Sequence, residues 1–126
     1  MTAPQLIALI DDDEAFREAM VDLLDSAGIE SISFESAEDF LCDARKSAAT
    51  CIVLDINLSG MSGLELQHAL CVAACPTPIL FLTSVDDPYV RERATTGGAG
   101  GFLTKPVDSA ALLHWIRVLN THPKGS

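Results

Sequence analysis

Apolar and polar positions alternate along the chain in five blocks, each a short apolar run followed by a segment of helical periodicity. Nearly continuous apolar runs are typical of strands buried on both faces of a sheet. The pattern predicts strands at residues 6–10, 29–34, 51–55, 79–83 and 102–104. The second run has a shorter apolar stretch and is more polar than the others, so we expect it at an edge of the sheet.

The segments between these runs begin with residues that cap helices and repeat apolar residues at helical spacing. Ser36 with Asp39 and Ser62 with Glu65 resemble capping boxes, and Asp87 precedes a proline suited to the first helical position. Glycines end the first and fourth helical patterns. We expect helices at about 15–27, 36–46, 62–74 and 88–97, and a last helix from Asp108 onward.

Strands that alternate with helices predict an α/β fold with a parallel sheet and helices on both faces. Each connection is long enough for a right-handed crossover. The chain has 126 residues, of which 48% are hydrophobic, enough for one domain with a substantial core. We expect the domain at residues 1–121 and a flexible tail at 122–126.

Charge and hydropathy exclude some classes of function. The formal net charge is −10 and the Lys and Arg residues are scattered, which argues against direct nucleic-acid binding by this domain. No apolar stretch approaches the roughly 20 residues of a membrane span, and the N-terminus lacks the basic flank of a signal peptide. A cytoplasmic protein without membrane contacts is the expectation.

The four cysteines, at 42, 51, 71 and 75, lack the spacing of a zinc site. We interpret them as small buried hydrophobic residues in a reducing compartment. The three histidines, at 68, 114 and 122, are expected on the surface.

Polar side chains follow four of the predicted strands at the point where each ends. They are Asp11 and Asp12, then Asp55, Thr83 and Lys105. The carboxyl ends of parallel strands meet at one edge of the sheet, which is where ligands bind in open α/β folds. Carboxylates crowded there repel one another unless a cation lies among them.

This set of residues fits phosphoryl transfer to a carboxylate. Asp11 and Asp12 can hold Mg²⁺, which prefers oxygen ligands. Asp55 is then the nucleophile that becomes an acyl phosphate. The Lys105 ammonium can neutralise charge on the phosphoryl oxygens, and the Thr83 hydroxyl can donate a hydrogen bond to the same group.

The chain resembles the receiver domain of two-component response regulators over essentially its whole length. Four separated motifs occur in the order and spacing of that family, at residues 10–14, 53–66, 82–84 and 98–106. The residues of the second and fourth motifs are most similar to those of the FixJ/NodW-like subgroup. The resemblance implies a flavodoxin-like (βα)5 fold with strand order 2-1-3-4-5.

The resemblance also implies roles for the residues at the sheet edge. Asp55 would be the phosphoacceptor. Asp12 would ligate Mg²⁺ directly, Asp11 mainly through water, and Asn57 through its backbone carbonyl. Lys105 would bind the phosphoryl group, and its bond to the following proline would be cis.

Two further residues would form the switch of such a domain. Thr83 would turn toward the phosphoryl group, and Phe102 would be the switch aromatic that moves inward with it. Asp13, which has no assigned role, is expected to cap the first helix.

The sequence departs from the family pattern in two places. Ser59 stands four residues after Asp55, where the family usually has proline, so we expect a more mobile loop and an altered phosphoryl lifetime. Residues 95–101 are rich in glycine where larger residues are common. This composition predicts a softer surface beside the fourth helix.

The function implied is a signalling switch that receives a phosphoryl group from a sensor histidine kinase and acts on an output domain or partner. Such a domain catalyses only its own phosphorylation and dephosphorylation. The protein is either a stand-alone receiver or part of a regulator with a C-terminal DNA-binding output domain outside this chain, and the subgroup resemblance favours the second. Dimerisation through the fourth helix and fifth strand is a further hypothesis.

Two alternatives stay open at this point. A haloacid-dehalogenase-type phosphatase also uses a nucleophilic Asp, a Ser or Thr, a Lys and Mg²⁺, but it needs an acid at the position of Asn57. A pseudo-receiver that acts without phosphorylation is disfavoured because the site residues are complete.

Overall fold

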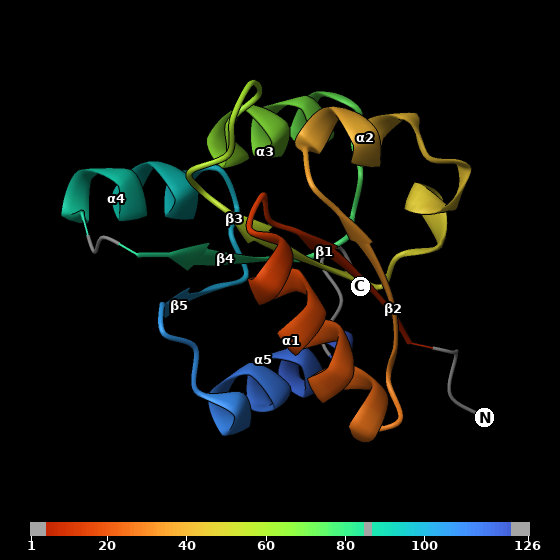
Figure 1. Cartoon of the computed structure of the whole chain (residues 1–126). Helices are drawn as coiled ribbons and strands as arrows, with labels where there is room; N and C mark the ends of the chain where they lie inside the picture. Colours follow the sequence, from red (N-terminus) through yellow and green to blue (C-terminus); the bar gives the residue numbers. More distant parts are fainter. Residues whose placement is uncertain (1–4, 85–86, 122–126) are drawn as a thin grey trace.

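A five-stranded parallel sheet forms the centre of the computed structural model, which describes residues 5–84 and 87–121 (Figure 1). The strands are β1 (Leu6–Ile10), β2 (Glu30–Phe34), β3 (Cys51–Asp55), β4 (Ile79–Thr83) and β5 (Gly101–Thr104). Their order in the sheet is β2-β1-β3-β4-β5. The predicted flavodoxin-like architecture is confirmed, including the edge position of the more polar β2.

Helices cover both faces of this sheet. They are α1 (Glu14–Ser26), α2 (Ala37–Cys42), α3 (Gly63–Val72), α4 (Pro88–Thr96) and α5 (Ser109–Thr121), with a 3₁₀ turn η1 (Ala44–Ala48) after α2. In Figure 1, α1 and α5 lie on one face, and α2, α3 and α4 lie on the other. The described helices include none that is both long enough and apolar enough to span a bilayer.

The core is divided by the sheet into two clusters, because successive strand side chains point to opposite faces. Ile10, Leu54 and Phe81 belong to the cluster beneath α2, α3 and α4. Leu9 and Val53 belong to the other cluster, which packs against α1 and α5. All three central strands are therefore buried on both faces, as their apolar runs predicted.

Most predicted helix starts are confirmed by their caps. Asp13 accepts a hydrogen bond from the backbone N–H of Phe16, and Ser62 forms a complete capping box with Glu65. Asp87 caps α4, with a proline at the start of that helix. These contacts satisfy backbone donors that have no partner within the helix.

The predicted helix at 36–46 is wrong in its second half. α2 ends at Cys42 because Asp43 adopts an extended conformation, with φ −85° and ψ 132°. The Asp43 carboxylate instead accepts a 2.7 Å hydrogen bond from the backbone N–H of Arg45 and forms a 2.9 Å ion pair with its guanidinium. A local side-chain contact thus replaces the helical hydrogen bonds and begins η1.

The glycines just before β5 and at its first residue allow close packing with α5. A Cβ atom at Gly101 would lie 2.7 Å from the ring of Trp115, and one at Gly100 would lie 2.8 Å from Leu119. A larger residue at either position would force the side chain of Trp115 or Leu119 to shift. Packing against α5 therefore explains the glycines at positions 100 and 101, and the softer surface expected beside α4 stays a prediction.

The cysteines do not all follow the expectation of burial. Cys51 is buried in β3, but Cys42 and Cys71 are exposed and Cys75 is half-buried; all four thiols are free. The exposed pair lies on helix surfaces, where a small apolar side chain is tolerated. His68 and His114 are exposed, as expected, and His122 lies outside the described residues, as does the predicted tail at 122–126.

Candidate functional site

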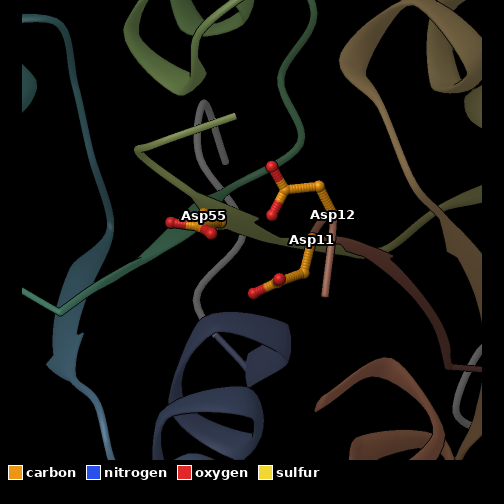
Figure 2. A group of neighbouring side chains, drawn as sticks. All are labelled: Asp11, Asp12 and Asp55. Carbon is orange, nitrogen blue, oxygen red and sulfur yellow. The ribbon is translucent and has the colours of Figure 1, made fainter. Parts of the chain in front are cut away.

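Three carboxylates converge at the carboxyl edge of the sheet. Asp11 and Asp12 follow β1, Asp55 ends β3, and one oxygen of each lies within 4.8 Å of the others (Figure 2). Asp11 and Asp55 are buried, whereas Asp12 is exposed. Among the described residues this is the one group of three or more acidic, histidine or cysteine side chains with such spacing. The sheet topology therefore brings together the acids that the sequence placed at strand ends.

Lys105 joins this cluster from the end of β5. Its ammonium donates a 2.6 Å hydrogen bond to Asp11 and a longer one, 3.4 Å, to Asp55. The backbone N–H of Lys105 donates to the carbonyl of Thr83 at 2.8 Å, which fixes the point where the chain leaves the sheet. The bond between Lys105 and Pro106 is cis, as the resemblance implied.

A hydrogen bond orients the Asp55 carboxylate, but its surroundings disfavour the ionised form. Its carboxylate accepts a 3.0 Å hydrogen bond from the backbone N–H of Asn57. Burial raises the pKa of Asp55, and the nearby Asp11 charge adds to the shift, while the Asn57 N–H and Lys105 oppose it. The ionised form is therefore costly in this site, which is typical of a functional carboxylate.

The pKa of Lys105 moves in the direction that keeps it charged. Burial by itself lowers this pKa, but the hydrogen bond to Asp11 and the charges of Asp55 and Asp11 outweigh burial, and the pKa is raised. The ammonium contacts Asp11 and Asp55, and Asp12 adds a third carboxylate, so the acidic groups of the cluster outnumber its one ammonium. Carboxylate oxygens in such an excess suit a divalent cation such as Mg²⁺.

Thr83 and Phe102 lie on neighbouring strands and on the same face of the sheet. Thr83 is buried at the end of β4, and Phe81, two residues earlier, faces the same side. Phe81 pairs with Phe102 in the β4–β5 register, and their rings stack with centroids 5.7 Å apart. The Phe102 ring is half-buried, and the guanidinium of Arg91 on α4 lies 5.0 Å from its centroid.

The loop after β3 makes hydrogen bonds that the sequence did not predict. The Ser59 hydroxyl donates to the Asp12 carboxylate at 3.4 Å, and the backbone N–H of Met61 donates to Glu38 on α2 at 3.1 Å. Gly60 between them has φ +74°, and a Cβ there would lie 2.6 Å from the Glu38 carboxylate. The positive φ favours glycine at this position, and a larger residue would also force the Glu38 carboxylate to shift.

Other contacts of the site come from α1. The Phe16 ring lies 4.3 Å from the Lys105 ammonium, and the Arg17 guanidinium donates a 2.7 Å hydrogen bond to the backbone carbonyl of Asp11. The sequence indicated Phe16 only as an apolar position of a helix. No sequence pattern links Phe16 or Arg17 to the acidic cluster, or Glu38 to the loop after β3, because these contacts depend on how the helices pack.

Comparison with known proteins agrees with this geometry. The family model of the response regulator receiver domain matches residues 7–117. Nodulation protein W of Bradyrhizobium diazoefficiens is 35% identical over 108 residues, covering 86% of this chain and 48% of that protein. The transcriptional regulatory protein FixJ of the same organism is 36% identical over 116 residues, covering 92% of this chain and 57% of that protein.

Solved structures give the same result. The response regulator StyR matches with a TM-score of 0.84 and 39% identity, over 94% of this chain and 62% of that one. A receiver domain named as BeF3-activated DrrB matches with a TM-score of 0.85 and 26% identity, over 95% of this chain and all of that one (100%).

The sheet order, the acidic edge and these matches define a receiver domain. The chain belongs to the response regulator receiver family and is similar to its FixJ/NodW-like members. Its function is that of a phosphorylation-activated signalling switch. The chain spans about half the length of the curated relatives it matches, 48% of nodulation protein W and 57% of FixJ.

Proposed function

We propose that Asp55 is the phosphoacceptor and that it receives a phosphoryl group from a phosphohistidine of a sensor histidine kinase. The observation that supports this most is the position of its buried carboxylate, at a strand end among Asp11, Asp12 and Lys105. The Asn57 N–H holds one carboxylate oxygen, and the other lies 3.4 Å from the Lys105 ammonium.

In the reaction, a carboxylate oxygen of Asp55 forms a bond to phosphorus as the bond from phosphorus to the imidazole nitrogen breaks. The nitrogen keeps the electron pair, and an acyl phosphate remains on Asp55. Lys105 moves from its ion pair with Asp11 toward the phosphoryl oxygens and neutralises part of their charge. The Thr83 hydroxyl donates a hydrogen bond to another of these oxygens.

The residues at this edge fit a Mg²⁺ ion. Asp55 and Asp12 would hold it directly, Asp11 mainly through water, and Asn57 through its backbone carbonyl. The donor set consists of oxygen atoms, and three carboxylates against one ammonium leave a charge that a divalent cation balances. When bound, Mg²⁺ supplies positive charge for the transferring phosphoryl group.

The signal would pass from the site to the surface through two side chains. When Thr83 turns toward the phosphoryl group, space opens beside β4 into which the half-exposed Phe102 ring moves. The ring then leaves the Arg91 side of α4, and the surface formed by α4 and β5 changes. Phosphorylation thereby shifts a two-state equilibrium.

We also propose a location and partners for the domain. The domain is cytoplasmic, and the altered α4 and β5 surface supports a homodimer or contacts an output domain. The formal net charge of −10 disfavours DNA binding by the receiver itself. Any contacts with DNA would therefore be made by an output domain outside this chain. The domain catalyses only its own phosphorylation and dephosphorylation.

A phosphatase of the haloacid-dehalogenase type is not favoured by any feature of the site. That chemistry needs a general acid two residues after the nucleophile, and Asn57 occupies this position. The N–H groups of an asparagine amide are far too weakly acidic to protonate a leaving group, so the formation of a covalent intermediate on Asp55 from a phosphomonoester would lack its general acid.

Incubation with acetyl phosphate and Mg²⁺, followed by intact-mass measurement, tests the proposal. We expect one phosphoryl group on the parent and none on Asp55→Asn, while Asp25→Asn, at an exposed acid on α1, behaves as the parent. Sustained hydrolysis of phosphomonoesters by the parent would favour the phosphatase. A complete lack of phosphorylation would favour a pseudo-receiver.

A further inference from the structure

The aromatic ring of Phe16 contacts one side of the Lys105 ammonium. The nitrogen lies 4.3 Å from the ring centroid, within the range of a cation–π attraction. Asp11 at 2.6 Å and Asp55 at 3.4 Å approach the same nitrogen. The ring thus supplies an uncharged contact where the other contacts are carboxylates.

The ring is held in place by its own helix. Phe16 is half-buried in the first turn of α1 and packs against the core cluster on the α1 and α5 face. The next residue, Arg17, donates a 2.7 Å hydrogen bond to the backbone carbonyl of Asp11. This bond fastens the start of α1 to the end of β1, so the ring and the acidic cluster keep a fixed relation.

We propose that Phe16 is a positioning residue for Lys105. Its ring keeps the ammonium directed at the Asp55 oxygens while the ammonium moves from Asp11 to the phosphoryl group. This inference rests on the proposed role of Asp55 as phosphoacceptor. Before phosphorylation, the shorter hydrogen bond of Lys105 is to Asp11. The ammonium must move away from Asp11 to reach a phosphoryl group on Asp55.

The chemistry of an aromatic ring suits this movement better than a further carboxylate would. A third carboxylate contact would compete with the phosphoryl oxygens for the ammonium and add negative charge to a crowded site. A cation over the ring face is attracted within about 6 Å of the ring centroid, so the ammonium can shift inside that range and keep the attraction. The ring also excludes water from one side of the ammonium, whose side chain is 20% exposed.

The test compares Phe16→Leu and Phe16→Met, which keep an apolar side chain, with Phe16→Tyr, which keeps the ring. Met20→Leu is the matched control, because it changes an apolar residue one turn further along α1 in the same cluster. Circular dichroism establishes that each variant is folded. The first measurement is the NMR shift of the Lys105 ε-methylene protons, which the ring current moves upfield.

We expect this upfield shift in the parent, Phe16→Tyr and Met20→Leu, and its loss in Phe16→Leu and Phe16→Met. The second measurement is the rate of phosphorylation by acetyl phosphate at saturating Mg²⁺. A loss of the cation–π attraction predicts a rate about 2- to 10-fold lower in the Leu and Met variants, with recovery in Phe16→Tyr.

Rates in the Leu and Met variants equal to the parent would overturn the positioning role. An equal loss of rate in Met20→Leu would also overturn it, since general packing of α1 would then explain the effect. The NMR shift does not depend on phosphorylation. A parent that shows the shift but accepts no phosphoryl group would therefore contradict the proposed function and not the contact between Phe16 and Lys105.

Discussion

The buried amide of Gln67 on α3 donates a 2.8 Å hydrogen bond to the backbone carbonyl of Ala94 on α4. Ala94 is the buried residue of α4, and Gly97 just after the helix lies so close that a Cβ there would be 2.7 Å from the Gln67 side chain. The two helices are therefore joined by a polar contact that is shielded from water, at the helix on which the proposed switch acts.

Replacing Gln67 with leucine should loosen α4 more than the rest of the domain. We expect the free energy of unfolding to fall by about 1 kcal/mol, the usual net value of one hydrogen bond, because the Ala94 carbonyl keeps its bond from the Ala99 N–H. Urea titration measures the loss, and amide hydrogen exchange should quicken mainly in α4. His68→Ala, at an exposed site on the same helix, is the control; exchange unchanged in α4 would contradict the role of Gln67.

Asp55→Asn should raise the free energy of unfolding when divalent cations are absent. Burial raises the pKa of Asp55, so between the unfolded and folded pKa values the unfolded chain binds fewer protons, and stability falls as pH rises through this window. At pH 7 the ionised carboxylate is therefore a cost, and its removal should stabilise the domain by about 1 kcal/mol, a common gain for a relieved functional site.

Magnesium should reverse this order. The ion binds the folded parent and stabilises it by mass action, and we expect a smaller increase in Tm for Asp55→Asn. Thermal unfolding at several Mg²⁺ concentrations measures both effects. An equal Mg²⁺ response in parent and variant would argue that Asp55 is not a ligand.

Ser59→Pro tests how the loop after β3 affects the aspartyl phosphate. The Ser59 hydroxyl donates to Asp12 at 3.4 Å, so proline removes a contact to a proposed Mg²⁺ ligand as well as stiffening the backbone. We expect a changed dephosphorylation rate, followed by loss of the phosphorylated mass after the phosphodonor is removed. Ser59→Ala separates the two effects, because it removes the hydroxyl alone. Identical rates in all three proteins would mean that this loop does not set the phosphoryl lifetime.

Cys51 should be inert until the domain unfolds. Burial raises the pKa of its thiol to about 12, so the reactive thiolate is absent near neutral pH. Iodoacetamide treatment followed by peptide mass mapping should label the exposed Cys42 and Cys71 and spare Cys51 until urea is added. Labelling of Cys51 at the rate of the exposed thiols would contradict its burial in β3.

The same raised pKa predicts a loss of stability in alkaline solution. An unfolded thiol ionises near pH 8.5, so from there up to pH 12 the unfolded chain binds fewer protons and the free energy of unfolding falls. We expect the loss due to this thiol to reach about 2 kcal/mol at pH 10, at roughly 1.4 kcal/mol per pH unit. Cys51→Ala should lack this component, which urea titrations at pH 7.5 and 10 would measure.

The fold was predictable from sequence because its rules are local and periodic. Apolar runs marked the strands, and capping residues such as Ser62 and Asp87 marked helix starts to within a residue or two. The error at 36–46 has a local cause as well. The Asp43 carboxylate bonds to the backbone of Arg45, and helical periodicity alone does not reveal this competition.

The proposed site was predictable only in the residues that lie at strand ends. A parallel sheet places Asp11, Asp55 and Lys105 at one edge whatever the helices do. The contacts of Phe16, Ser59 and Glu38 depend on the rotation of helices and the path of a loop, which no spacing in the sequence encodes. The pattern of exposed thiols was missed for a related reason, because residue type is a weak guide to the depth of a helix position.

The close packing of Trp115 on Gly101 has a practical consequence. Trp115 is the one tryptophan of the chain, and its ring lies against Gly101 at the start of β5, the residue before Phe102 in the sequence. Indole emission is sensitive to nearby backbone and aromatic groups, so the intrinsic fluorescence of the unlabelled domain should follow any displacement of β5. Rapid mixing with a phosphodonor would then resolve the switching step in real time, without an attached dye.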